Sequence, residues 1–273
     1  MTDALKTSRL AIRHVTTYHW SEPVTYALQQ LRLIPKSRPG QQVVDWVTDI
    51  DGGQIEVSFD DAHANTTQLV SVDSGRTDVT ITAHGIVEVQ DQAGVIGDQG
   101  GYMPLWMFLR PTDLTRRGSG TMALARDVRE IEDPLDRLHA LSAAIREAVG
   151  YDTGTTEVNQ TAEDAIAVGS GVCQDHAHIF VTCARLLDYP ARYVSGYLRM
   201  NDRDEQDATH AWAEAHLEGL GWVGFDISNG YSPDDRYVRV ATGLDYSDAA
   251  PISGIRQGLG VESMDVKVTV SEA

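Results

Sequence analysis

Apolar and polar residues alternate along roughly the first 110 residues of the chain. Short stretches such as VVDWVTDI, QIEVSFD, TTQLVSVD and TDVTITAHGIVEVQ are separated by Gly, Asp, Asn and Pro. Turn residues that recur about every ten positions are typical of antiparallel β-sandwiches. The pattern therefore predicts a β-sandwich in a first domain, residues 1–115, which ends within the polar segment PTDLTRRGSG.

The pattern changes to a helical period beyond this segment. Residues 134–149 carry one apolar stripe, with Asp133 placed as an N-cap and Pro134 at the first helical position. Thr161 and Asp164 resemble a capping box that opens a shorter helix ending at Gly169. Helices mixed with strands predict an α+β class for a second domain, residues 116–273.

A third helix is expected in GVCQDHAHIFVTCARLLDYP, where Cys173 stands at the first turn. Backbone N–H groups at a helix N-terminus stabilise negative charge, so this position favours a nucleophilic thiolate. A lone cysteine on an apolar helix face is nevertheless more often a packing residue. A catalytic interpretation therefore depends on a base elsewhere in the chain.

A candidate base lies on a predicted β-hairpin formed by HAWAEAHL, the turn EGLG and the strand WVGFD. Alternation places small alanines on the face that packs on the helix, and His210, Trp212 and Glu214 on the other face. His210 and Asp226 meet only if Asp226 lies opposite His210 or Trp212, because side chains alternate across a sheet. Cys173, His210 and Asp226 then supply a nucleophile, a base and an orienting carboxylate.

These segments resemble the bacterial transglutaminase-like family of cysteine proteases, through GVCQDHAH, PARYVSGYL, HAWAEAHLEGLGWVGFD and DDRYVRVATGLDYSDAAP. The N-terminal half is similar to the β-rich N-terminal domain of that family through VTTYHWSEPV, LRLIPKSRPGQQ and DAHANTT. The family usually has Phe-Gly where this chain has His63-Ala64. The resemblance implies a papain-like transglutaminase core, with the cysteine-bearing helix packed on an antiparallel sheet, and a triad of Cys173, His210 and Asp226.

The resemblance implies thiol-dependent acyl transfer or hydrolysis at amide bonds of a peptide or protein substrate, through a thioester. Crosslinking of protein glutamine to an amine acceptor and a non-catalytic binding module remain alternatives. Gln174, next to the nucleophile, is a candidate for holding an oxyanion, and Trp212 is a candidate for lining the cleft. No cofactor is expected, and the oligomeric state is left open.

Charge and composition narrow the range of partners. Lys and Arg number 22 against 40 Asp and Glu, for a net charge of −18. A field of this sign repels phosphate backbones and anionic lipids, so we expect neither nucleic acid nor membrane partners.

The start MTDALKTSRLAIRHV lacks the layout of a signal peptide, and no apolar run reaches the roughly 20 residues of a membrane span. We expect a cytoplasmic protein.

The remaining reactive side chains favour structural interpretations. Cys183 lies ten positions beyond Cys173 on the same helix and is expected to be an inert packing thiol. His176 and His178 do not face each other on a helix and show no zinc spacing, so no metal site is expected. The acidic loop 202–207 lacks the pattern of an EF-hand and is left unassigned.

Overall fold

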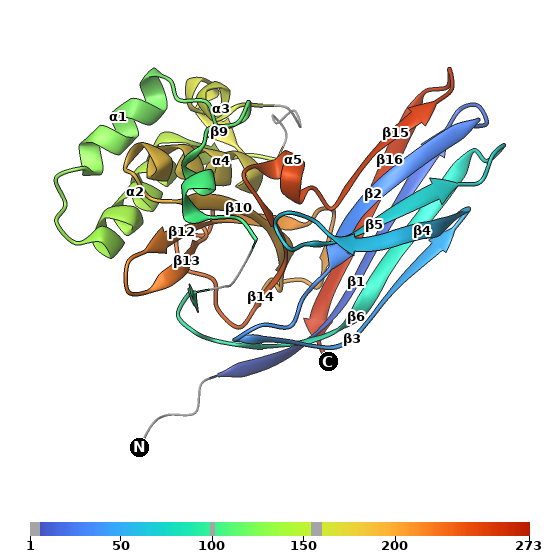
Figure 1. Cartoon of the computed structure of the whole chain (residues 1–273), viewed down its shortest axis with the longest axis horizontal. Helices are drawn as coiled ribbons and strands as arrows, with labels where there is room; N and C mark the ends of the chain where they lie inside the picture. The colour runs from blue at the N-terminus through green and yellow to red at the C-terminus, as the bar shows by residue number, and fades with distance from the viewer. Residues whose placement is uncertain (1–5, 99–101, 154–159) are drawn as a thin grey trace.

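The computed structural model describes residues 6–98, 102–153 and 160–273. Two parts are visible in Figure 1: a sandwich of long strands, and a core in which helices cover an antiparallel sheet. This arrangement confirms the predicted α+β class with a β-sandwich at the N-terminus.

One sheet of the sandwich has the order β11-β16-β1-β6-β3, and the other has the order β15-β2-β5-β4. The strands are β1 (Thr7–Trp20), β2 (Tyr26–Ile34), β3 (Gln41–Asp51), β4 (Gly53–Asp60), β5 (Thr66–Val72), β6 (Asp78–Gln90), β11 (Glu205–Gln206), β15 (Ile252–Gln257) and β16 (Glu262–Glu272). Alternate residues of β1 and β6 are buried, as the predicted period of two requires. Leu31, Val70 and Ile81 are among the buried residues between the sheets.

The C-terminal strands correct the predicted division of the chain. The sequence interpretation placed residues 252–273 with the second domain, but β15 pairs with β2 and β16 pairs with β1. In Figure 1 these last strands lie beside the blue strands of the N-terminus. The β1–β16 ladder runs from Leu10↔Glu272 to Trp20↔Glu262. The sandwich therefore requires both ends of the chain.

The core sheet has the order β14-β10-β12-β13-β7, and helix α4 packs on β12. Its strands are β7 (Val95–Gly97), β10 (Ala191–Leu198), β12 (His210–Leu217), β13 (Gly221–Phe225) and β14 (Tyr237–Gly243), with β8 (Gly150–Tyr151) and β9 (Ser170–Gly171) paired separately. Its helices are the 3₁₀ helix η1 (Leu105–Leu109), α1 (Ser119–Val128), α2 (Pro134–Ala148), α3 (Ala162–Val168), α4 (Cys173–Leu186) and α5 (Tyr246–Ala249). The small side chains of Ala211, Ala213 and Ala215 let the buried helix approach the sheet closely.

The predicted helix ends are confirmed in detail. The carboxylate of Asp133 accepts hydrogen bonds from Leu135 N and Asp136 N at the start of α2. Thr161 and Asp164 form the capping box of α3, and Gly169 ends that helix with a φ of 77°. Local chemistry therefore decides where these helices begin and end.

Asn65 and His63 connect the sandwich to the core. The Asn65 side chain bonds both the N–H and the carbonyl of Thr242 at 2.8 Å. The neighbouring Ala64 adopts a φ of 61°, a conformation that costs an L-residue about 1 kcal/mol. His63 turns its Nε2 to Asp248 Oδ2 at 3.2 Å, which adds a contact across the same boundary.

Candidate active site

Cys173 is the first residue of α4 and is partly exposed, whereas the rest of the helix is largely buried. The carboxylate of Asp175 turns back to accept a hydrogen bond from Val172 N at 2.8 Å, which stabilises the helix start. Glycine is required at position 171, because a Cβ there would lie 2.7 Å from Asp175 Oδ2. The sequence around the cysteine thus places its thiol at a capped helix N-terminus, where backbone dipoles favour a thiolate.

His210 begins β12, and Asp226 immediately follows β13. The ladder pairs Ala213 with Phe225 and Glu214 with Gly224, so continuing this register puts Asp226 opposite Trp212. The predicted register is confirmed: His210 Nε2 lies 2.6 Å from Asp226 Oδ2. Cys173 is also a neighbour of His210, and it contributes to raising the pKa of the imidazole. Since Nε2 is occupied by Asp226, Nδ1 is the ring nitrogen left for a thiol.

The carboxylate of Asp226 is fully buried and receives several hydrogen bonds besides that of His210. Tyr237 donates its hydroxyl to Oδ2 at 2.6 Å, and the Asn229 side chain donates to Oδ2 at 2.7 Å. The Asn229 backbone N–H donates to Oδ1 at 3.2 Å. Sequence reasoning missed both residues. Asn229 is signalled only by its position in the turn after Asp226, and Tyr237 comes from β14.

The electrostatics of the pair favour a charged imidazolium next to a carboxylate. Burial disfavours the charge on His210, but the charge of Asp226, the hydrogen bond to Asp226 and the influence of Cys173 raise the pKa of His210 to about 10. Burial likewise opposes ionisation of Asp226, yet His210, Tyr237 and Asn229 together hold the pKa of this carboxyl below its usual value. The arrangement therefore stabilises an imidazolium that can support a thiolate.

Trp212 and Gln174 differ in how far they suit their predicted roles. The indole of Trp212 is buried, stacks on His210 with ring centroids 6.2 Å apart, and meets the edge of Tyr237 at 5.4 Å. This packing makes it a support for the imidazole, with little surface left for a substrate. Gln174 follows Cys173 in the first turn of α4, and its role in holding an oxyanion stays a prediction.

The other histidines and cysteine of α4 have structural partners. Cys183 is buried with its thiol directed at Thr121 O at 3.4 Å, and burial raises the pKa of this thiol. His176 lies between Ser228 Oγ and Val149 O, and His178 accepts the backbone N–H of Tyr246 at 3.1 Å. In the described ranges, the His, Cys, Asp and Glu side chains form no group of three or more able to hold a metal ion. Nor does any helix there have the length and apolar character to cross a membrane.

Comparison with known families agrees with this geometry. Residues 122–227 match the transglutaminase-like superfamily, and residues 10–88 match the bacterial transglutaminase-like N-terminal region. The chain thus contains a transglutaminase-like core, preceded by a bacterial transglutaminase-like N-terminal region. The first match spans all three residues of the candidate triad.

Individual relatives extend over almost the whole chain. An uncharacterized protein of Mycobacterium leprae is 26% identical, over 96% of this chain and 98% of its own length. An uncharacterized protein of Mycobacterium tuberculosis strain H37Rv is 29% identical, over 91% of this chain and 88% of its own. A crystal structure titled "Putative Cysteine Protease from Cytophaga hutchinsonii" has a TM-score of 0.79 and 23% identity, and the match covers 98% of this chain and 91% of that one. Both parts of the fold are therefore shared with that protein.

Proposed function

We propose that this protein catalyses thiol-dependent acyl transfer or hydrolysis at amide bonds of peptide or protein substrates, with Cys173 as nucleophile. One observation carries the proposal: the imidazole of His210 bonds a buried carboxylate at 2.6 Å and lies near enough to the partly exposed Cys173 for that side chain to raise its pKa. Packing alone does not require these three groups to meet, whereas nucleophilic catalysis does.

The proposed chemistry has two steps. The Cys173 thiolate attacks the amide carbonyl carbon, and the carbonyl π electrons move to oxygen. When that tetrahedral intermediate collapses, the C–N bond breaks, the imidazolium of His210 gives its proton to the leaving amine, and a thioester remains. An acceptor then attacks the thioester while His210 takes its proton, which regenerates the thiolate. Asp226 holds the ring and stabilises its charge throughout.

The acceptor in the second step decides the biological activity. Water as acceptor gives a cysteine protease or amidase, and a primary amine gives glutamine crosslinking. A binding module that retains the residues without turnover is the third candidate. The partly exposed thiol of Cys173 beside the charged imidazole of His210 supports the enzymatic candidates. A binding role gives no reason to keep a charged imidazole next to an accessible thiol.

Alkylation of the native protein tests the nucleophile without a known substrate. At pH 6.5 an ordinary cysteine, with a pKa of about 8.5, is only about 1% thiolate. We expect iodoacetamide to label Cys173 once and leave the buried Cys183 unmodified. His210→Ala should slow this labelling about tenfold or more, because the cation that supports the thiolate is lost. His84→Ala is a matched control, since it removes an exposed His–Asp pair (3.1 Å) in the sandwich.

One labelling outcome would remove the basis of the proposal. Labelling that is slow, equal at both cysteines and indifferent to His210→Ala would favour the binding module. The second arm incubates the protein with a library of glutamine-containing peptides, with and without a primary amine, and follows intact mass. A thioester adduct on the parent protein that is absent from Cys173→Ala supports acyl transfer, and release of an amine conjugate rather than free acid identifies the acceptor.

A further inference from the structure

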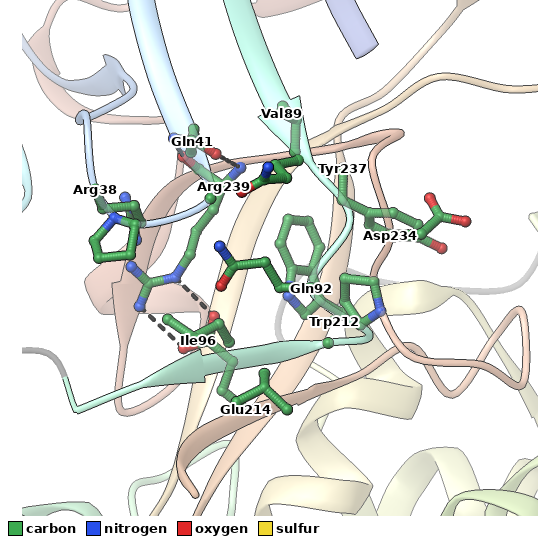
Figure 2. Close-up of a pocket in the computed structure, with 16 residues that line it drawn as sticks. Arg38, Gln41, Val89, Gln92, Ile96, Trp212, Glu214, Asp234, Tyr237 and Arg239 are labelled. Atoms are coloured by element: carbon green, nitrogen blue, oxygen red, sulfur yellow. Dashed lines mark hydrogen bonds and ion pairs between the residues drawn. The ribbon is translucent and has the colours of Figure 1, made fainter. Parts of the chain in front are cut away.

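A buried cluster of arginines lies where the core meets the sandwich, on the same face of β12 as His210. At its centre is Glu214, which is fully buried. Arg192 on β10 places Nε 2.5 Å from Glu214 Oε2, and Arg239 on β14 places Nε 2.7 Å from Oε1 and Nη2 3.0 Å from Oε2. Figure 2 shows the contacts of Arg239, together with the bond from its backbone N–H to Gln41.

A third guanidinium reaches this cluster from the sandwich. Arg38 lies on a short turn closed by paired backbone hydrogen bonds with Gln41. Burial lowers the pKa of Arg38 to about 10; the charge of Glu214 raises it, and the charge of Arg192 lowers it further. The positive charges of Arg38 and Arg192 therefore repel each other, and burial leaves this repulsion only weakly screened.

The local charges do not balance. Within the ranges that the structure describes, Glu214 is one carboxylate set against the three guanidinium groups of Arg38, Arg192 and Arg239, which leaves two positive charges. The other basic side chains that line the same cavity have their own partners: Lys36 pairs with Asp60 at 2.6 Å, and His63 contacts Asp248 at 3.2 Å. Asp98 also lines the cavity, but its carboxylate is exposed and turned to His216.

The cavity beside these groups has a volume of about 330 Å³ and is lined by Ser37, Arg38, Asn65, Arg192, Arg239 and Thr242, among others. Arg38 Nη1 and Arg192 Nη2 are buried, and neither has a hydrogen-bond partner within the part of the chain that the structure describes. The Arg192 side chain is only 8% exposed, so its N–H groups cannot all be satisfied by bulk water. A buried charged donor without an acceptor is costly, and it marks a place for one.

We propose that this cavity is a binding site for a phosphate group, either as free phosphate or on a small phosphate ester. A phosphate carries about −1.5 to −2 charges at pH 7, which matches the excess of two. Its oxygens accept charge-assisted hydrogen bonds from guanidinium groups, and Arg38 Nη1 and Arg192 Nη2 each offer one buried donor without a partner among the described residues. Neither Cys173, His210 nor Asp226 lines this cavity, so the site is separate from the candidate active site.

Gln41 and Trp222 hold the donors in place before a ligand arrives. The Gln41 side chain bonds the carbonyls of Lys36 and Arg239, at 3.0 and 2.9 Å, which ties the Arg38 turn to β14. The Arg192 guanidinium lies 3.7 Å above the ring of Trp222, so the ring fixes the plane of the fork. Donors that are fixed in advance lose little entropy when an anion binds.

Isothermal titration with inorganic phosphate tests this site, at constant ionic strength set with chloride. We expect one saturable phosphate site per chain. Arg38→Gln should weaken it about tenfold or more; this variant leaves both ion pairs of Glu214 intact, so the fold should hold. Arg126→Gln is the matched control, since Arg126 is an exposed arginine of α1 paired with its neighbour Asp127. Arg38→Lys, which keeps the charge but removes the fork, should fall between parent and Arg38→Gln.

Malonate and glycerol phosphate distinguish the ligand classes. Malonate is a dianion without phosphorus, and its binding more tightly than phosphate would overturn the phosphate assignment. Glycerol phosphate binding more tightly than inorganic phosphate identifies an ester as the ligand, and the reverse order identifies the free ion; both support the site. Absence of saturable heat with the parent protein, or equal affinity in the parent and Arg38→Gln, would overturn the proposal. Thermal melting of each variant confirms that the fold is retained.

Discussion

Replacing Tyr237 with phenylalanine isolates the contribution of one buried hydroxyl to the candidate triad. The change removes the 2.6 Å hydrogen bond to Asp226 Oδ2 and leaves the ring in place against Trp212. A hydrogen bond to a charged group contributes about 1.5–3 kcal/mol. Asp226 keeps its bonds to His210 and Asn229, so the site should stay assembled. We expect the free energy of unfolding to fall by an amount within this range.

Tyr197→Phe provides a matched control at an equally buried ring. Tyr197 bonds the Nδ1 atom of His14 at 3.0 Å, and burial lowers the pKa of His14 to about 4, so this partner is neutral at pH 6. A bond between neutral groups contributes about 0.5–1.5 kcal/mol. The two variants thus remove the same hydroxyl oxygen, once from a charged partner and once from a neutral one. The loss in the free energy of unfolding should be about twice as large for Tyr237→Phe.

Urea unfolding of the parent and both variants at pH 6 measures the difference. At pH 6 the pKa shifts of Asp226 and of His210 both stabilise the fold. The lowered pKa of Asp226 stabilises the fold above its ordinary value of 3.8, and this stabilisation is lost as the pH falls. The raised pKa of His210 stabilises the fold fully below 6.5, and that stabilisation is lost as the pH rises through about 10. An equal loss in the two variants, or a larger loss in Tyr197→Phe, would refute a charged Asp226 held by Tyr237.

Three further predictions address the triad, the acid limb and the sandwich. Asp226→Asn should slow turnover of any identified substrate on the order of 10³-fold without abolishing it, whereas Cys173→Ala should abolish it; equal rates in Asp226→Asn and the parent would contradict the role of the carboxylate. His14 and His178 are buried, and burial lowers their pKa values to about 4 and about 3. As the pH falls below 6.5, these histidines therefore bind protons in the unfolded chain before they do so in the folded protein. At pH 5 each histidine should lower the free energy of unfolding by about 2 kcal/mol relative to pH 7, which is measured as a lower urea midpoint. Ending the chain after residue 251 removes β15 and β16 and exposes the paired edges of β1 and β2, so size-exclusion chromatography should show aggregation; a monomeric product with native circular dichroism would contradict the two-ended sandwich.

Much of the core follows from local sequence. Asp133 and Thr161 cap their helices through neighbouring backbone N–H groups, so a few residues suffice to predict them. The hairpin register follows from alternation: Ala211 and its partners face α4, which leaves His210 and Asp226 on one side. Cys173 at the start of α4 is predictable for the same reason, since the apolar period and the preceding glycines define where the helix begins. The likeness of residues 122–227 to a transglutaminase-like core follows from these motifs as well.

The remaining features depend on contacts between residues far apart in the chain. Residues 252–272 look like ordinary strands, and only the open edges of β1 and β2 determine that they complete the sandwich. Tyr237 is one tyrosine among many until β14 brings its hydroxyl to Asp226. Arg38 and Arg192 each read as a solvated charge in a chain of net charge −18. Side-chain periodicity reports which face is buried, but it carries no information about the partner across that face. The partner is determined only when the sandwich and the core pack together around Glu214.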